Sequence, residues 1–344
     1  MKLSFIIPFY NGGKYIIESL NSLYNQDIPQ SEYEVIVVDD CSPKKEDIQL
    51  LEKYATTHPT LRIIRNERNL RCGESRNNGL IQAKGEYIWF VDQDDYIATN
   101  CLGSILKHCN SEKLDILYFD YRDVSDDLSL NKKHNVVTKA SNVKSGLDYI
   151  KEDCYGDFWH SGYDTNVWHA VYRRQFMLEN KIFSPEVSYC EDMIVAQHAI
   201  IVAKKIMAIP NDYYCYRYNP ASVFHTEVGV KGRPMFDASI YAGSEIIKLS
   251  ELIPSSYKGL QHIVRSGGVY RLNSFTKSIL KTKSKERKTF LEMVTKYADV
   301  VTCAQSHLTP INKWIITHPK YVCLWPHIIY AYIKICKKTV LKSC

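Results

Sequence analysis

The most constraining feature of this 344-residue chain is an apolar segment that ends in a cluster of acidic side chains. Residues 87–91 read Tyr-Ile-Trp-Phe-Val, and Asp92, Gln93, Asp94 and Asp95 follow directly. A short run of aromatic and β-branched residues is typical of a strand buried between two layers. Because carboxylates are costly to bury, we expect the three aspartates at an open sheet edge, where a hard cation and phosphate groups offset their repulsion.

A second predicted strand, residues 34–38, also ends in a carboxylate pair, Asp39 and Asp40. The four strands predicted in the first hundred residues cover 3–8, 34–38, 61–65 and 87–91. Segments of helical periodicity separate them, and this alternation predicts an α/β fold with a mostly parallel sheet flanked by helices. The carboxyl ends of parallel strands meet at one edge, where ligands bind. Two acidic strand ends there predict a nucleotide site.

Composition and motifs narrow the class of protein. The chain is 45% hydrophobic and 24% charged, which predicts a globular protein without long disordered tracts. Its 11 cysteines form no C-x-x-C pair, which indicates reduced thiols in the cytoplasm and no zinc site. No signal peptide and no apolar run of about 18 residues are apparent. Glycine patterns of dinucleotide-binding folds and P-loops are also missing.

Charge is unevenly distributed along the chain. The formal net charge is +6, but residues 231–344 carry 19 Lys or Arg against 6 Asp or Glu, which leaves residues 1–230 acidic. Residues 231–344 are predicted to be mainly helical. A basic region favours contact with an anionic surface, such as a membrane or a nucleic acid. A solvated helical face explains the same pattern equally well.

Several side chains near the predicted edge have the chemistry to bind a nucleotide. Tyr10 follows the first strand and can stack on a base, although an exposed loop aromatic is the simpler interpretation. Asp40 can accept a hydrogen bond from a base or ribose, or cap a helix. Arg71 and Arg76 flank the start of a predicted helix and can pair with phosphate or base.

Two carboxylate pairs are candidates for the chemistry. Asp92 and Asp94, two positions apart after a strand, can hold a divalent cation together with diphosphate oxygens. In that arrangement the cation takes up charge on a departing diphosphate. Glu191 and Asp192 precede an apolar helix, where acidic residues either stabilise the helix dipole or supply a general base. Spacing alone does not choose between these two roles.

Four ordered segments resemble family 2 glycosyltransferases of the GT-A fold, of the bacterial surface-polysaccharide type. They are FIIPFYNGGKYIIESLNSLYNQ, EVIVVDDCS, ERNLRCGESRNNGLIQAKGEYIWFVDQDDY and FSPEVSYCEDMIVAQHAI, and the resemblance covers roughly residues 3–222. It implies a catalytic domain over residues 1–230, with a nucleotide half at about 1–122 and an acceptor half at about 145–230. Residues 231–344 lie outside it.

The resemblance also implies roles for individual residues. Pro8, Tyr10 and Asp40 would bind the base, usually uracil, and Arg76 would lie near the nucleotide. Asp92-x-Asp94 would be the D-x-D motif, in which Asp94 is the direct ligand of Mn²⁺ or Mg²⁺. Asp192 would be the catalytic base. The residues implied on the acceptor or phosphate side are Asp95, Trp168, Glu191 and Arg217.

The implied reaction is a single displacement that inverts configuration. A hydroxyl of a glycan or lipid-linked glycan would attack a nucleotide-diphosphate sugar, with a UDP-sugar as the expected donor. Residues 321–344 combine apolar and lysine side chains, which suggests contact with the inner face of the cell membrane, or docking on the catalytic domain. The alternatives are a non-catalytic nucleotide-sugar-binding partner subunit and a nucleotidyltransferase. Nucleic-acid binding rests on the basic region alone and is not expected.

Overall fold

The structure is a computed structural model of the full chain. It describes residues 1–126, 131–134, 137, 139–153, 166–187, 190–219, 233–279, 313–314 and 317–318. The chain divides into two compact units, of which the first contains residues 1–186 and 191–222. The second contains residues 187–190 and 223–344. The domain boundary predicted near residue 230 stays a prediction, because residues 220–232 lie outside the described part.

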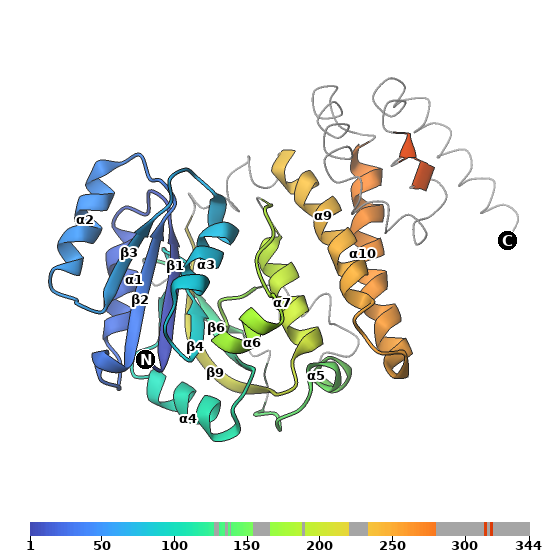
Figure 1. The fold of residues 1–344 in the computed structure, drawn as a ribbon, viewed down its shortest axis with the longest axis horizontal. Helices are drawn as coiled ribbons and strands as arrows, with labels where there is room; N and C mark the ends of the chain where they lie inside the picture. The colour runs from blue at the N-terminus through green and yellow to red at the C-terminus, as the bar shows by residue number, and fades with distance from the viewer. Residues whose placement is uncertain are drawn as a thin grey trace, which may run out of the picture. The chain divides into compact units, whose positions relative to one another are not determined.

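Strands and helices alternate through the first unit (Figure 1). Its strands are β1 (Leu3–Phe9), β2 (Tyr33–Asp39), β3 (Leu61–Arg65), β4 (Tyr87–Phe90), β5 (Tyr96–Ile97), β6 (Ile116–Val124), β7 (Asn131–His134), β8 (Ala170–Arg173) and β9 (Ile206–Arg217). Its helices are α1 (Tyr15–Tyr24), α2 (Lys45–Ala55), α3 (Arg71–Gln82), α4 (Leu102–Glu112), α5 (Gly146–Asp153), α6 (Arg174–Glu179) and α7 (Glu191–Val202), with a 3-10 turn at Gln30–Glu32.

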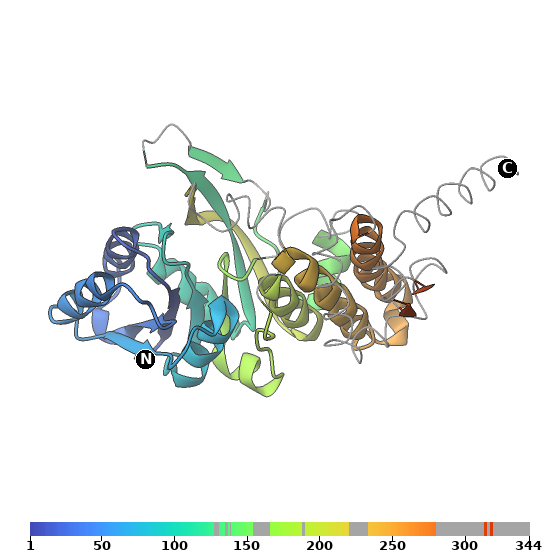
Figure 2. The same cartoon turned by 90° about the horizontal axis from the view of Figure 1, so that it is seen from above.

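The described strands form one sheet in the order β3-β2-β1-β4-β8-β6-β9-β5, and β7 pairs with β6 off this path. Strands β3, β2, β1 and β4 are parallel, as the alternating pattern predicts. Beyond β4 the sheet is mixed, because β8 runs antiparallel to both β4 and β6. The β6–β7 hairpin projects from the rest of the sheet (Figure 2). The α/β prediction is confirmed, and antiparallel strands complete the sheet.

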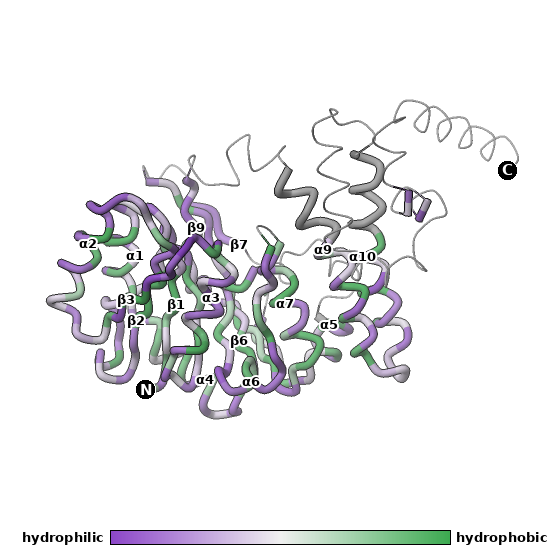
Figure 3. Tube along the Cα trace, turned by 45° about the horizontal axis from the view of Figure 1, so that its top comes forward, coloured by the Kyte–Doolittle hydropathy of each residue, from purple (hydrophilic) through white to green (hydrophobic). Residues whose placement is uncertain are grey.

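Opposite faces of β1 pack against different helices. Phe5 and Ile7 share a buried cluster with Leu20 of α1 and Ile105 of α4. Strand residues alternate between the two faces of a sheet, so Ile6 points the other way, toward α3. In Figure 3 hydrophobic residues concentrate along the strands and α7, whereas the loops at the sheet edges are largely hydrophilic.

Helix α3 lies unusually close to the sheet at Gly79. A β-carbon built on this glycine would overlap the side chain of Ile6 and crowd Val38. Only a residue without a side chain lets the helix backbone approach so closely. Gly79 therefore allows the short distance between α3 and the strands β1 and β2.

The second unit contains two long helices, α9 (Arg233–Ser250) and α10 (Lys258–Ile279), joined through a 3-10 turn at Ser255–Tyr257. Buried residues such as Ile246 and Val264 line their contact. This agrees with the mainly helical character predicted for the region. Within the described residues, no helix is both long and apolar enough to cross a membrane. The segment 321–344, predicted to contact a membrane, lies outside the described residues.

Candidate active site

Three strand ends meet at the carboxyl edge of the sheet. β1 pairs in parallel with β2 on one side and with β4 on the other, so Tyr10, Asp40 and Asp92 leave neighbouring strands at the same edge. Gln93, inside the acidic cluster, also binds the loop that follows β1. Its Oε1 accepts the backbone N–H of Tyr10 at 2.9 Å, and its Nε2 donates to the carbonyl of Tyr10 at 3.3 Å. The acidic motif predicts no role for Gln93, and its two bonds hold the loop that carries Tyr10.

The two residues expected to line a base pocket differ in exposure. Tyr10 exposes 44% of its surface, whereas Pro8 is buried within β1. An exposed aromatic ring at this edge is free to stack on a planar ligand, and a buried proline shapes the strand beneath it. Contact of either residue with a nucleotide stays a prediction.

Asp40 holds the loop that leads into α3. One carboxylate oxygen accepts the side-chain amide of Asn66 at 2.9 Å and the backbone N–H of Leu70 at 2.7 Å. The other accepts the backbone N–H of Arg71 at 2.8 Å. An ionised carboxylate has about four acceptor positions, so these bonds leave room for about one more partner. The predicted bond from Asp40 to a base would have to use that position.

Arg76 is the centre of the acidic site. Its side chain is buried on α3 and donates to Asp92 at 2.8 Å and to Glu191 at 3.4 Å. It also pairs with Asp192 through the same nitrogen that binds Glu191. Asp92 follows β4, while Glu191 and Asp192 open α7. One guanidinium therefore joins the candidate metal ligand to the candidate base, a link that the spacing of the motifs does not reveal.

The two acids that open α7 have shifted pKa values, and Glu191 is buried while Asp192 is partly exposed. Burial raises the pKa of Asp192 to about 8, the Arg76 guanidinium opposes this rise, and the carboxylates of Glu191 and Asp92 add to it. Burial also raises the pKa of Glu191, again against Arg76. A carboxyl group with a pKa near 8 can exchange a proton near neutral pH, which is the property required of a general base.

The C-terminal end of β9 supports the turn that carries Asp94 and Asp95. Tyr214 donates its hydroxyl to Asp95 at 2.6 Å, and the backbone N–H of Arg217 donates to the other oxygen of Asp95 at 2.7 Å. Asn219 donates its amide to Asp94 at 2.9 Å. Asp95 is buried, and burial raises its pKa well above the usual range. Its contacts within the chain fasten the acidic turn to β9.

Two of the residues placed on the acceptor or phosphate side have clear packing contacts. Trp168 is buried, and its ring stacks on Tyr214 with centroids 4.4 Å apart. Its carbonyl accepts the indole N–H of Trp89 at 2.7 Å. Arg217 donates through Nε to the carbonyl of Asp94 at 2.8 Å. Trp168 thus packs against the β9 residue that binds Asp95, and Arg217 binds the acidic turn itself. Contact of either residue with an acceptor or a phosphate stays a prediction.

Asp92 and Asp94 have the chemistry of a divalent-cation site. Both supply hard carboxylate oxygens, which Mn²⁺ and Mg²⁺ accept. Burial raises the pKa of Asp94, the Asn219 amide opposes this, and the neighbouring charge of Asp92 adds to it. A cation would relieve that repulsion. Among the described residues no group of three or more His, Cys, Asp or Glu is arranged to bind a metal. The two carboxylates have the ligand chemistry of a divalent cation, and the binding of a cation there stays a prediction.

Comparisons with known proteins identify the family of this chain. The sequence profile described as glycosyl transferase family 2 matches residues 4–178. The poly(ribitol-phosphate) β-N-acetylglucosaminyltransferase TarS of Staphylococcus aureus is 31% identical over 219 residues, which are 63% of this chain and 35% of TarS. A poly(ribitol-phosphate) β-glucosyltransferase of Bacillus spizizenii is 32% identical over 223 residues, 62% of this chain and 32% of that protein. The chain thus spans about a third of the length of these curated relatives.

A solved structure shares the fold. The crystal structure of TarS residues 1–349 in complex with UDP-GlcNAc superimposes with a TM-score of 0.69 at 23% identity, covering 97% of this chain and 92% of that one. This chain belongs to glycosyl transferase family 2, and it shares the mixed α/β fold of TarS, the GT-A type of fold that the sequence predicts. The family prediction is confirmed. Membership of this family argues against the nucleotidyltransferase alternative, whereas the non-catalytic nucleotide-sugar-binding subunit stays an open alternative.

We expect the Arg76→Met substitution to destabilise the first unit by about 3–5 kcal/mol, because removing one partner leaves buried carboxylates without a counter-charge. Without the guanidinium, the pKa values of Glu191 and Asp192 rise further in the folded state. Folding then takes up protons, so the loss of stability grows as the pH is raised from 5.5 to 8. Denaturant unfolding of both proteins at several pH values measures this difference.

The matched control is Lys2→Met, which removes an ion pair between Lys2 and Glu32 whose side chains are 50% and 32% exposed. Such surface pairs contribute at most about 1 kcal/mol, so this variant should unfold nearly as the native protein does. A variant at Arg76 that loses no more stability than the control, at every pH, would contradict the central role of the guanidinium.

Proposed function

We propose that this chain transfers a sugar from a UDP-sugar to a hydroxyl of a glycan, with inversion of configuration and with help from a divalent cation. One observation carries the proposal: Asp92 and Asp192 bind the same guanidinium of Arg76. The candidate diphosphate end and the candidate base are thereby held within the span of one side chain, so a donor and an acceptor bound at this site would lie close together.

The roles of the chain's own residues follow from their positions. Asp192 is the base that takes the proton of the acceptor hydroxyl as that oxygen attacks the anomeric carbon. Arg76 is a positioning residue, which orients the carboxylate of Asp192 and limits the rise in the pKa of that group. Asp92 and Asp94 are the carboxylates that would hold Mn²⁺ or Mg²⁺. When bound, the cation supplies positive charge that stabilises the departing diphosphate.

The substrate classes rest on the relatives. TarS has been solved with UDP and with UDP-GlcNAc, which favours a UDP-sugar as donor here. The names of TarS and of the Bacillus spizizenii relative both specify a poly(ribitol-phosphate) acceptor. EpsJ of Bacillus subtilis, 28% identical over 67% of this chain, is named only as a glycosyltransferase. We propose a cell-surface polymer or its lipid-linked precursor as the acceptor, with the enzyme in the cytoplasm at the inner face of the cell membrane.

The Asp192→Asn substitution should lower transfer by about 10² to 10⁴-fold, because asparagine cannot accept the proton. UDP binding should change little, since the substitution keeps the shape of the side chain. Turnover of a UDP-sugar and the thermal shift with UDP, measured on the same preparation, separate the two effects. Near-normal turnover in the Asp192→Asn protein would show that Asp192 is not the general base.

The activity of the native enzyme should depend on pH through Asp192. Only the ionised carboxylate takes up a proton, and the pKa of this group is raised to about 8. The value of kcat/KM should therefore rise about tenfold per pH unit from about pH 6 and level off above about pH 8. A profile that is already flat between about pH 5.5 and 8 would show that no group with such a pKa controls the reaction.

UDP should stabilise the protein against heat more than GDP, CDP or dTDP, and Mn²⁺ should enlarge the UDP shift. Ligand at about 100 times its Kd adds about 2.7 kcal/mol, which is enough for a clear shift. The Asp94→Asn variant should lose the contribution of Mn²⁺ and keep a smaller UDP shift. Glu52→Gln on the exposed side of α2 makes the same charge change elsewhere and should behave as the native protein. An unchanged Mn²⁺ effect in the Asp94→Asn variant would exclude Asp94 as a ligand.

A further inference from the structure

Two cavities lie side by side in the first unit, between α1 and the strands β5, β6 and β9. Their volumes are about 310 and 400 Å³, and both are lined by Ser22 and Tyr96. These volumes fall at the lower end of the range of small-molecule sites, which is about 300–1,000 Å³. Because Ser22 and Tyr96 line both cavities, we describe the pair together as one groove.

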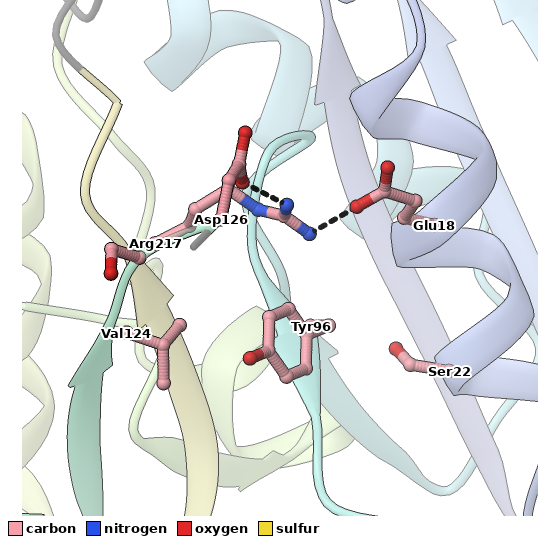
Figure 4. Close-up of a pocket in the computed structure, with 7 residues that line it drawn as sticks. Glu18, Ser22, Tyr96, Val124, Asp126 and Arg217 are labelled. Carbon is pink, nitrogen blue, oxygen red and sulfur yellow. Dashed lines mark hydrogen bonds and ion pairs between the residues drawn. The ribbon is translucent and has the colours of Figure 1, made fainter. Parts of the chain in front are cut away.

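The first cavity is built around Arg217 (Figure 4). Its guanidinium lies between two carboxylates, at 2.7 Å from Glu18 and 2.6 Å from Asp126. It also lies over the ring of Tyr96, 5.2 Å from the centroid. Each charged group on this wall therefore has an opposite charge beside it. The cavity offers charge-assisted hydrogen bonds without a strong net charge.

The second cavity has the same character. Arg122 pairs with Asp212 on its wall, and the remaining polar lining includes neutral amides and a hydroxyl, from Asn21, Asn25 and Thr99. Amide groups both donate and accept hydrogen bonds. The groove as a whole therefore contains both donors and acceptors of hydrogen bonds, together with the ring of Tyr96.

This lining selects a class of ligand. A phosphate would face the carboxylates of Glu18, Asp126 and Asp212, and a polyamine would find the same carboxylates already paired with guanidinium groups. A neutral sugar ring avoids both problems. Its hydroxyls can bond to carboxylates, amides and guanidinium edges, and its C–H groups can pack beside the ring of Tyr96, over which Arg217 lies.

The groove is also connected to the acidic turn. Arg217 forms the wall of the first cavity, and its Nε and backbone N–H donate to Asp94 and Asp95 respectively. The end of β9 therefore links the first cavity to the turn that carries Asp94 and Asp95. A chain held in the groove would lie next to the place where a sugar is transferred, but outside it.

We propose that this groove binds neutral sugar units of a glycan chain, away from the transfer centre. The proposal rests on the proposed function for its choice of glycan as partner. Bound there, a polymer would be retained near the active site between transfers. The groove residues that carry the proposal, Ser22, Asn25, Tyr96 and Thr99, belong to neither the base nor the cation site.

Saturation-transfer NMR on the full chain tests the ligand class directly. The probes are glucose, N-acetylglucosamine and maltose, with glucose 6-phosphate and spermidine as charged comparisons, all in the presence of UDP and Mn²⁺ to fill the donor site. We expect saturation of the neutral sugars, strongest for maltose. Thr99→Trp, which fills the second cavity, should abolish most of the maltose signal. Asn25→Ala, which removes one amide, should weaken maltose binding about two- to tenfold.

Thr57→Trp is the matched control, because Thr57 is an exposed threonine just after the end of α2. It should leave the maltose signal unchanged. The proposal is overturned if no neutral sugar is saturated, if Thr99→Trp and Thr57→Trp behave alike, or if spermidine or glucose 6-phosphate displaces maltose. If no sugar binds but UDP still raises the melting temperature, only the proposed sugar site in the groove is rejected. If sugars bind but no nucleotide raises the melting temperature, the proposed function is rejected instead.

Discussion

The charge balance around Arg76 is the constraint on which the rest of the site depends. The turn after β4 and the start of α7 bring three carboxylates together in a poorly hydrated space, where they would repel one another strongly. A single buried guanidinium makes that arrangement stable. Arg76 reaches it because α3 packs close to the sheet, and that close packing depends on Gly79. The height of one helix above the sheet therefore decides whether the acidic groups can share a site.

Local patterns are sufficient to predict the first half of the fold. Apolar runs that alternate with helical periodicity specify parallel strands, and the acidic ends of two such runs specify the sheet edge where they meet. Contacts between distant segments are not predictable in this way. Arg76 and Asp192 are separated by 116 residues, and nothing in the spacing of either motif reveals that they pair. The antiparallel insertion of β8 is missed for the same reason, because pairing between distant strands leaves no local signal.

Several predicted site residues turn out to have well-defined structural contacts as well. Trp168 stacks on Tyr214, and Asp95 receives hydrogen bonds from Tyr214 and Arg217. From the sequence alone, an aromatic or acidic residue near a motif is a candidate for ligand contact, because the same residue types also serve purely structural roles. Only burial and partners separate the roles. The supporting residues Gln93 and Asn219 escape prediction because a lone amide has no distinctive spacing in a sequence.

Asp40 holds the carboxyl edge of the sheet, the proposed nucleotide site, in a defined conformation without a ligand. Cys41 and Arg71 both have left-handed backbone conformations, with φ of 59° and 74°, which are costly for residues other than glycine. The carboxylate of Asp40 accepts the backbone N–H of Arg71, so the bond that holds the loop is also the one that maintains its strained residue. Substitution of Asp40 would then disturb two things together, a candidate base contact and the start of α3. Because Arg76 stands further along that helix, the nucleotide edge and the acidic cluster are positioned by the same carboxylate.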